Sequence, residues 1–268
     1  MIAIGQELLL ETKKHLLISE DSPWGNIEVW QEGTVRSLYI QNNIATQSQL
    51  DMARKEKLLP QYCRAMMSFL LFKSNPKSVL LFGLGGGSIV HFLYHWFPRL
   101  KITAVDINDK VINIAKAFFD VSETPQVSVQ VADASTYINQ TKQHNIDVIL
   151  VDIHNGECLP AFLYNPDFIA QCFRALSAKG ILVINVLVNT NEELLNLMRA
   201  LRQSFSGISL CMTLDNQKNI LLFAFKSPDK LLNINANEYQ RKYGIEFDQF
   251  VNKIIKVDAK INPEKPFS

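Results

Sequence analysis

The chain has 268 residues, 47% of them hydrophobic, and its 27 Lys and Arg against 26 Asp and Glu leave a formal net charge of +1. A chain of this size can bury one large core and a small accessory domain. The balanced charge gives no electrostatic argument for nucleic acid or an anionic membrane, and no apolar run approaches the roughly 18 residues of a membrane span. The four cysteines include no CxxC pair, so neither a metal site nor a disulfide framework is indicated. With no secretory signal pattern, we expect a cytoplasmic protein.

Short β-like segments open the chain. Alternating apolar residues separated by turn signals predict a small antiparallel β unit over Lys14–Ile44. Helical spacing follows over Ala53–Phe72, with Pro60 as the place where a helix begins or kinks. We expect three parts, namely a small β domain (1–50), a main nucleoside-binding domain (51–226) and a helical tail (227–268).

A glycine-rich turn follows the first strongly apolar strand. Val79–Phe82 is apolar, glycines stand at 83, 85, 86 and 87, and a helical pattern starts at Ser88. This order opens a nucleotide-binding α/β unit, in which glycines let the backbone approach a ligand. A dinucleotide fingerprint has Gly or Ala at the sixth position of GxGxxG, where this chain has Ser88. No GK[ST] follows the glycines, which excludes a P-loop. The turn resembles that of the S-adenosylmethionine-binding, methyltransferase-like fold.

Strands and helices then alternate along the chain. Further strands are expected at Lys101–Asp106, Val127–Val131, Asp147–Val151 and Ile181–Val186. Helices are expected at Ser88–Phe97, Asn108–Phe119, Ser135–Gln143, Asp167–Leu176 and Glu192–Phe205, with a turn at Lys179-Gly180. In the tail, Ala236–Tyr243 and Phe247–Lys256 have helical patterns.

This alternation predicts an α/β fold with a doubly wound, mostly parallel sheet. Ile208–Thr213 and Asn219–Phe225 read as a hairpin, which would make the last strand antiparallel. We therefore expect a Rossmann-like, methyltransferase-like domain with a seven-stranded sheet, preceded by the small antiparallel β domain.

Acidic residues stand at the ends of three predicted strands, where ligands bind in such sheets. Asp106 suits ribose hydroxyls, and Asp133 suits an adenine amino group, from which its carboxylate can accept, with the backbone NH of Ala134 next to it. Asp152 begins a loop that would pass over the ligand. Each acid has an alternative role as a helix N-cap, a common use of Asp after a strand. No residue pattern points to a metal.

Several segments together resemble one family, the spermidine synthases or polyamine aminopropyltransferases, and in particular its bacterial spermidine synthase-like branch. They are Ser22–Ile27 (SPWGNI), Leu38–Ser48, Tyr62–Met66 (YCRAM), the glycine turn, AVDIN, VADAS and Asp147–Gly156 (DVILVDIHNG). The family transfers an aminopropyl group from decarboxylated S-adenosylmethionine to a polyamine. The resemblance implies a homodimer that binds this compound or S-adenosylmethionine. The expected cofactor contacts are Gln47, Gly83, Gly85, Gly87, Asp106, Ile107, Asp133, Ala134 and Asp152.

The chain departs from this family at the residues that carry the chemistry. In spermidine synthases the second Asp of a D-S-S-D loop takes the proton of the amine, and here the loop reads Asp152-Ile153-His154-Asn155. Asn cannot take a proton at neutral pH, whereas His154 has a pKa range that suits a base. The family's Y-[HQ]-E segment falls on Gln61-Tyr62-Cys63 without its acid.

The catalytic candidates are therefore Asp152, His154 and Asn155. Three functions stay open: a transferase of aminopropyl groups, an S-adenosylmethionine-dependent methyltransferase, and a non-catalytic nucleoside-binding relative.

Overall fold

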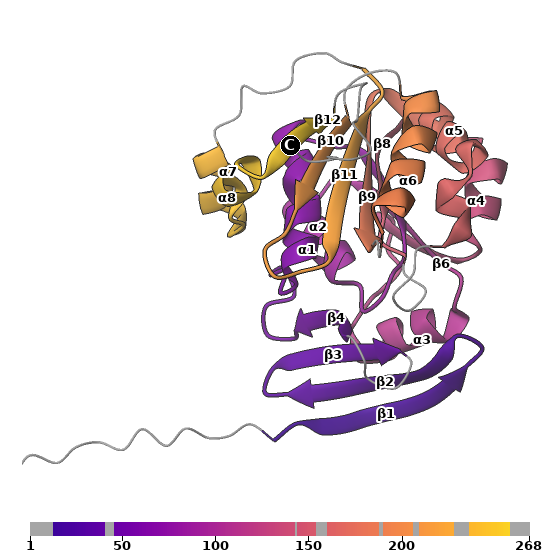
Figure 1. Ribbon diagram of the computed structural model, residues 1–268. Coiled ribbons are helices and arrows are strands. Elements are labelled where there is room, and N and C mark those ends of the chain that lie inside the picture. Colours follow the sequence, from indigo (N-terminus) through magenta and orange to yellow (C-terminus); the bar gives the residue numbers. More distant parts are fainter. Residues whose placement is uncertain are drawn as a thin grey trace, which may run out of the picture.

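The computed structural model describes residues 13–40, 46–142, 144–153, 160–187, 190–205, 209–227 and 236–257. In these ranges the chain forms a small antiparallel sheet and a larger mixed sheet flanked by helices (Figure 1). The small sheet lies at one end of the large one. The expected α/β fold with a β domain in front of it is confirmed.

The small sheet has a strand, β4 (Thr46–Asp51), beyond the range Lys14–Ile44 in which the sequence predicted the β unit. Its strands follow each other in the order β1 (His15–Ser22), β2 (Gly25–Glu32), β3 (Val35–Ile40) and β4 (Thr46–Asp51), all antiparallel. The sequence of β4, TQSQLD, is too polar to read as a strand, yet Ser48 and Leu50 are buried. Leu50 packs with Ile27, Val29 and Leu38 of the same sheet.

The large sheet has the order β12-β10-β11-β9-β8-β5-β6-β7 among the described residues. Its strands are β5 (Ser78–Phe82), β6 (Lys101–Asp106), β7 (Val127–Val131), β8 (Ile146–Val151), β9 (Leu176–Leu187), β10 (Ser209–Thr213), β11 (Asn219–Phe225) and β12 (Ile254–Val257). The five strands from β7 to β9 are parallel, and β11 runs antiparallel to both of its neighbours. The predicted hairpin and its antiparallel strand are confirmed.

Helices cover both faces of the large sheet (Figure 1). They are α1 (Gln61–Met66), the 3-10 helix η1 (Met67–Leu71), α2 (Ser88–Trp96), α3 (Asp109–Phe118), α4 (Ala134–Gln140), the 3-10 helix η2 (Ala161–Tyr164), α5 (Pro166–Ala175), α6 (Asn191–Ser204), α7 (Ala236–Tyr243) and α8 (Phe247–Val251). Within β5, Val79 and Leu81 pack on the side of α1 and α2, whereas Leu80 and Phe82 pack on the side of α4 and α5. Burial on both faces explains why the central strands are apolar throughout.

Helix α3 joins the two sheets. Val111 and Ile114 pack against the small sheet, while Ile112 and Ala115 belong to the core of the large one. Because one helix presents residues to both cores, the two sheets are held in a fixed relation.

The helix predicted within Ala53–Phe72 begins at Gln61, directly after Pro60, where the sequence placed its start or kink, because Pro60 lacks an NH and the residue before a proline avoids the helical region. Two other sequence predictions were wrong in detail. The turn expected at Lys179-Gly180 is an irregularity within β9, where the pairing with β8 shifts register. The helix expected over Phe247–Lys256 ends at Val251, and β12 follows it and pairs with β10. Among the described residues the large sheet therefore has eight strands instead of the seven expected.

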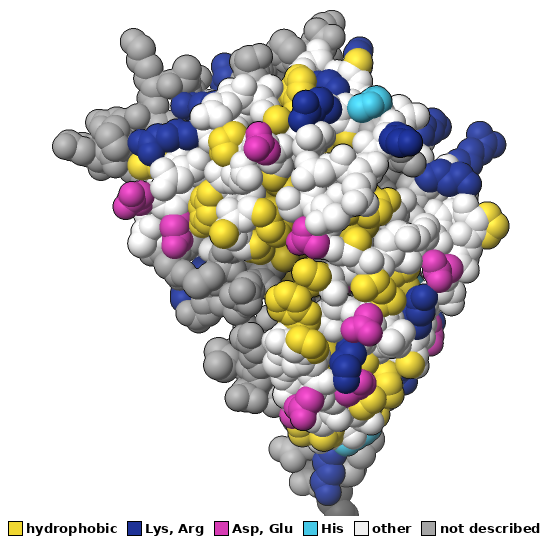
Figure 2. All heavy atoms as spheres, turned by 90° about the vertical axis from the view of Figure 1, so that its right-hand side faces the viewer, with side chains coloured by type: hydrophobic (Ala, Val, Ile, Leu, Met, Phe, Trp, Pro, Cys, Tyr) yellow, Lys and Arg dark blue, Asp and Glu magenta, His cyan; other side chains and the backbone are white. Residues whose placement is uncertain are grey.

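One face of the molecule shows how the charges are distributed. In Figure 2, acidic side chains are scattered among apolar ones, and basic side chains gather toward the upper edge. None of the helices in the described ranges is long and apolar enough to cross a membrane.

Candidate functional site

A cavity of about 360 Å³ lies where the carboxyl ends of the parallel strands face the small sheet. The large sheet contributes the residues that follow β5, β6, β7 and β8, and α1 contributes Tyr62 and Cys63. The small sheet contributes Trp24, Leu38, Ile40, Gln47 and Ser48. The cavity therefore lies between the two parts of the fold, at the position where ligands bind in open α/β sheets.

The glycine turn after β5 packs directly against the start of the loop after β8. Gly83 has a φ of +93°, and a Cβ on it would lie 2.1 Å from the carbonyl oxygen of Asp152. The NH of Asp152 also donates to the carbonyl of Phe82, at 2.8 Å. A residue without a side chain is required here because two backbones occupy the space.

Gly87 has a different role from the one expected. It is the N-cap of α2, with a φ of +75°, and a Cβ on it would lie 2.3 Å from a methyl carbon of Val121. It is not among the residues that line the cavity. Its requirement for glycine comes from packing, so a direct ligand contact through Gly87 is not supported by the geometry.

Asp106 lies at the end of β6, and its carboxylate holds the backbone on either side. Its Oδ2 accepts from the NH of Leu84 at 2.9 Å, and its Oδ1 accepts from the NH of Asn108 at 3.0 Å. Burial raises the pKa of Asp106, and the backbone NH groups partly offset this effect. Asp106 is not the helix cap, because Asn108 caps α3 by accepting from the NH of Lys110.

Asp133 takes the helix-cap role that the sequence left open, and it also lies at the cavity wall. Its carboxylate caps α4 by accepting from the NH of Thr136 at 2.8 Å. It also lines the cavity together with Ala134. Ile107 lies on the same wall with 43% of its surface exposed, which leaves an apolar surface available to a flat ring.

Asp152 lies next to α1 in the remaining wall. Its Oδ1 accepts from Nδ2 of the fully buried Asn185 at 2.9 Å. The Tyr62 hydroxyl donates to the carbonyl of Gln47 at 3.2 Å. Burial, with a smaller contribution from the charge of Asp152, raises the pKa of Tyr62, so its hydroxyl remains a donor at neutral pH. His154 and Asn155, the other two catalytic candidates, lie outside the described residues.

Eight of the nine expected cofactor residues line this one cavity, and Gly87 is the exception. Ligand contact by these residues stays a prediction. Sequence reasoning did not assign cavity positions to Trp24, Ser48, Asn108 or Phe162. Trp24 stands in the SPWGNI motif and Ser48 follows Gln47, so those two had a signal, whereas Phe162 had none. Within the described ranges, no group of three or more His, Cys, Asp or Glu side chains is placed to hold a metal ion.

The sheet order, the glycine turn and the cavity at the strand ends define a methyltransferase-like α/β protein with an added N-terminal β domain. Within that class, the chain belongs to the spermine/spermidine synthase domain family, whose family model matches residues 59–235. The resemblance stated from the sequence is thus confirmed.

Relatives of known name support this assignment. A polyamine aminopropyltransferase of Chromobacterium violaceum is 33% identical over 234 residues, which cover 85% of this chain and 88% of that protein. The polyamine aminopropyltransferase of Neisseria meningitidis is 32% identical over 86% of this chain and 89% of that protein. An eEF1A lysine and N-terminal methyltransferase of Xenopus laevis is 25% identical over 72% of this chain but only 31% of that protein.

Solved structures show the same fold. Spermidine synthase from Thermotoga maritima superposes with a TM-score of 0.70 and 17% identity, covering 89% of this chain and 83% of that chain. Human methyltransferase-like protein 13 in complex with SAH superposes with a TM-score of 0.59 and 21% identity, covering 75% and 97% of the two chains. The fold is thus common to proteins named for aminopropyl transfer and for methyl transfer.

Proposed function

We propose that this protein binds decarboxylated S-adenosylmethionine in the cavity and transfers its aminopropyl group to an amine. The observation that carries the proposal is that one cavity brings together the glycine turn, the acids Asp106 and Asp133, and the carboxylate of Asp152. The first three suit a nucleoside, and the last suits a cationic amine. Family membership supports the same reaction, and with it we propose the homodimer that the resemblance implied, which light scattering would test.

The proposed reaction needs a group that removes a proton. The acceptor amine loses a proton to a base, its nitrogen bonds to the carbon next to the sulfonium, and the carbon–sulfur bond breaks. The sulfur leaves as a neutral thioether on the nucleoside. A positioned base contributes about 10²–10⁴-fold to such a step. Because Asn155 cannot supply it, we propose that Asp152 holds the amine and His154 takes the proton.

Methyl transfer is the second candidate, favoured by the sequence similarity to the eEF1A methyltransferase. The two reactions differ in what the cavity must accept at the amino-acid end of the cofactor. A methyltransferase accommodates the carboxylate of S-adenosylmethionine, whereas an aminopropyltransferase rejects it.

Calorimetric titration with both compounds tests the proposal. We expect decarboxylated S-adenosylmethionine to bind at least about tenfold more tightly, which corresponds to about 1.4 kcal/mol. Tighter binding of intact S-adenosylmethionine would favour methyl transfer. Tight binding of either compound without turnover of any amine would favour a non-catalytic relative, and Asn155 would explain it.

A further inference from the structure

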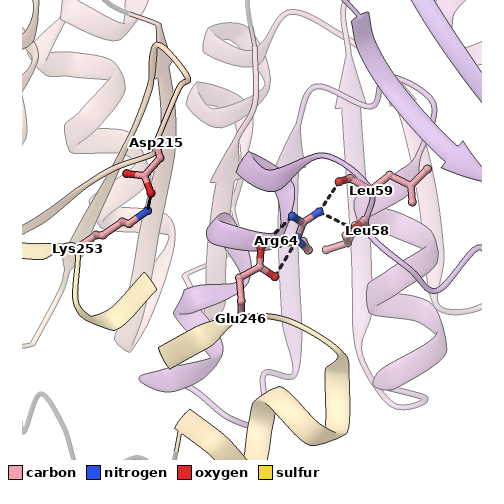
Figure 3. Close-up of polar contacts among 6 residues, drawn as sticks. All are labelled: Leu58, Leu59, Arg64, Asp215, Glu246 and Lys253. Carbon is pink, nitrogen blue, oxygen red and sulfur yellow. Dashed lines mark hydrogen bonds and ion pairs between the residues drawn. The ribbon is translucent and has the colours of Figure 1, made fainter. Parts of the chain in front are cut away.

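The YCRAM segment carries an arginine that the proposed reaction does not use. Tyr62 and Cys63 line the cavity, but Arg64 does not. Figure 3 shows its guanidinium between the carboxylate of Glu246 and the carbonyl groups of Leu58 and Leu59. Glu246 lies 182 residues further along the chain.

The contact between Arg64 and Glu246 is bidentate. Nε of Arg64 donates to Oε1 at 2.9 Å and to Oε2 at 3.0 Å, and Nη2 lies 2.8 Å from Oε1. The two side chains are 23% and 22% exposed. A forked guanidinium–carboxylate pair is directional as well as charged, and partial burial reduces screening by salt. The contact therefore fixes the orientation of the Arg64 side chain.

The same guanidinium holds the chain that enters α1. Its Nη1 donates to the carbonyl of Leu58 at 3.2 Å and to that of Leu59. Leu58 in turn bridges to Leu50 of β4, the strand that carries Gln47. Arg64, the entry to α1 and β4 therefore form one connected unit. The hydrogen bond from Tyr62 to Gln47 lies within that unit, on the cavity wall.

Glu246 belongs to the C-terminal segment, residues 236–257, which lies beyond the residues matched by the family model. This segment has its own anchors. Phe247 and Phe250 are fully buried, β12 pairs with β10, and Lys253 forms an ion pair with Asp215 (Figure 3). These anchors should keep the segment in place even without the carboxylate of Glu246. Removing that carboxylate is therefore expected to affect mainly Arg64 and α1.

The α1 wall lies next to the amine side of the cavity. Tyr62 and Cys63 line the same cavity as Asp152, the carboxylate proposed to hold the amine. Asp106 is the last residue of β6, and Gly83 and Asp133 stand just after β5 and β7. These three strands are held by the ladder of the large sheet. A shift of α1 thus affects the amine side more than the nucleoside side.

We infer that Arg64 is a positioning residue through which the C-terminal segment holds Tyr62 and the α1 wall in the geometry that accepts the amine. This inference rests on the proposed function for the identity of the ligand. Its positional part, the control of α1 by Glu246, does not depend on turnover.

Two substitutions at Glu246 and one control test the inference in the full-length protein. Glu246→Ala removes the partner of Arg64, and Glu246→Gln keeps its shape and one acceptor oxygen. Lys253→Met removes a different ion pair of the same segment, which joins Asp215 between β10 and β11 rather than α1. The readouts are hydrogen exchange of peptides covering residues 58–66, steady-state kinetics with 1,4-diaminobutane, and calorimetric titration with decarboxylated S-adenosylmethionine.

For Glu246→Ala we expect exchange in residues 58–66 to accelerate about tenfold or more, since a hydrogen-bonded charge is lost. The KM for 1,4-diaminobutane should rise about tenfold, while kcat and the affinity for decarboxylated S-adenosylmethionine change less than about twofold. Glu246→Gln should be intermediate, and Lys253→Met should match the wild type in all four measurements.

Equal exchange in Glu246→Ala and wild type would overturn the inference. So would the same change in Lys253→Met, because the effect would then come from general loosening of the segment. A fall in kcat at unchanged KM in Glu246→Ala would also contradict the inference, because Arg64 would then have no specific effect on binding of the amine. If no amine is turned over, the proposed function fails, and the exchange difference between Glu246→Ala and Lys253→Met still decides whether Glu246 positions α1.

Discussion

The buried amide of Asn185 donates from Nδ2 to Oδ1 of Asp152, over 2.9 Å. Asn185 lies on β9, and its own Oδ1 accepts from Nδ2 of Asn219 on β11, also at 2.9 Å. Side chains from β9 and β11 therefore orient a carboxylate that follows β8. A fully buried asparagine in the otherwise apolar run 181–187 of β9 costs free energy unless its polar groups are hydrogen-bonded. Here one of its hydrogen bonds goes to Asp152, which lines the cavity.

Asn185→Leu is expected to lower kcat about 10- to 100-fold, because a hydrogen bond to a charged group is worth about 1.5–3 kcal/mol. Affinity for decarboxylated S-adenosylmethionine should change little. Steady-state kinetics and calorimetry measure the two effects. Asn219→Ala removes only the outer link and should have a smaller effect on kcat. If Asn185→Leu kept full activity, the hydrogen bond from Asn185 to Asp152 would not be needed for the reaction.

Gly83→Ala should disrupt both stability and nucleoside binding. The new Cβ would meet the carbonyl oxygen of Asp152 at 2.1 Å, so the two backbones must separate. Gly244→Ala is a matched control, because Gly244 also has a positive φ (+66°) but has nothing within 4 Å of the added Cβ. Urea unfolding should show about 1–2 kcal/mol lost in Gly244→Ala from backbone strain alone, and more in Gly83→Ala. If both variants lost the same free energy of unfolding, the backbone of Asp152 would be able to move away from the added Cβ without a loss of stability.

Asp106→Ala should weaken nucleoside binding at least about tenfold, or about 1.4 kcal/mol. The carboxylate is lost as a ligand group, and the NH groups of Leu84 and Asn108 lose their acceptor. Calorimetry with decarboxylated S-adenosylmethionine gives the comparison, with Asp167→Ala on the exposed first turn of α5 as the control. Unchanged affinity in Asp106→Ala would contradict the assignment of this wall to the nucleoside.

Asp147 gives a pH dependence of stability. Burial would raise its pKa, but Lys73 at 2.7 Å, the NH of Lys77 and the hydroxyl of Ser177 together lower the pKa below its usual value. As pH falls, the unfolded chain takes up this proton first. The stabilisation is thus complete above the unfolded pKa of about 3.9 and is lost as pH falls through the folded pKa.

Asp147→Asn should therefore be less stable than the wild type by about 1–3 kcal/mol near pH 6. The difference should shrink below about pH 4, where the unfolded wild-type chain takes up the proton before the folded protein does. Urea unfolding at several pH values between 6 and 3 measures this. A difference that stays constant over the whole range would mean that the charge of Asp147 contributes nothing.

The sequence predicted the large sheet and the cavity walls because those features are local. A buried parallel strand is a short apolar run, and Asp106 or Asp152 marks the point where such a strand ends. The strand β4 was missed because its burial is visible only once β3 lies beside it. For β12, the apolar spacing from Phe247 continued a helical pattern that pairing with β10 overrode. No sequence pattern could join Arg64 to Glu246.

The Arg64–Glu246 pair also has a consequence for how the protein is made. Domains generally fold from the N-terminus as synthesis proceeds, so the glycine turn and the sheet around it can form on the ribosome while residue 246 has not yet been translated. A nascent chain then has most of the cavity but lacks the contact that holds α1. Under the proposed function, competence to bind the amine would therefore arrive only after residue 246 has been translated.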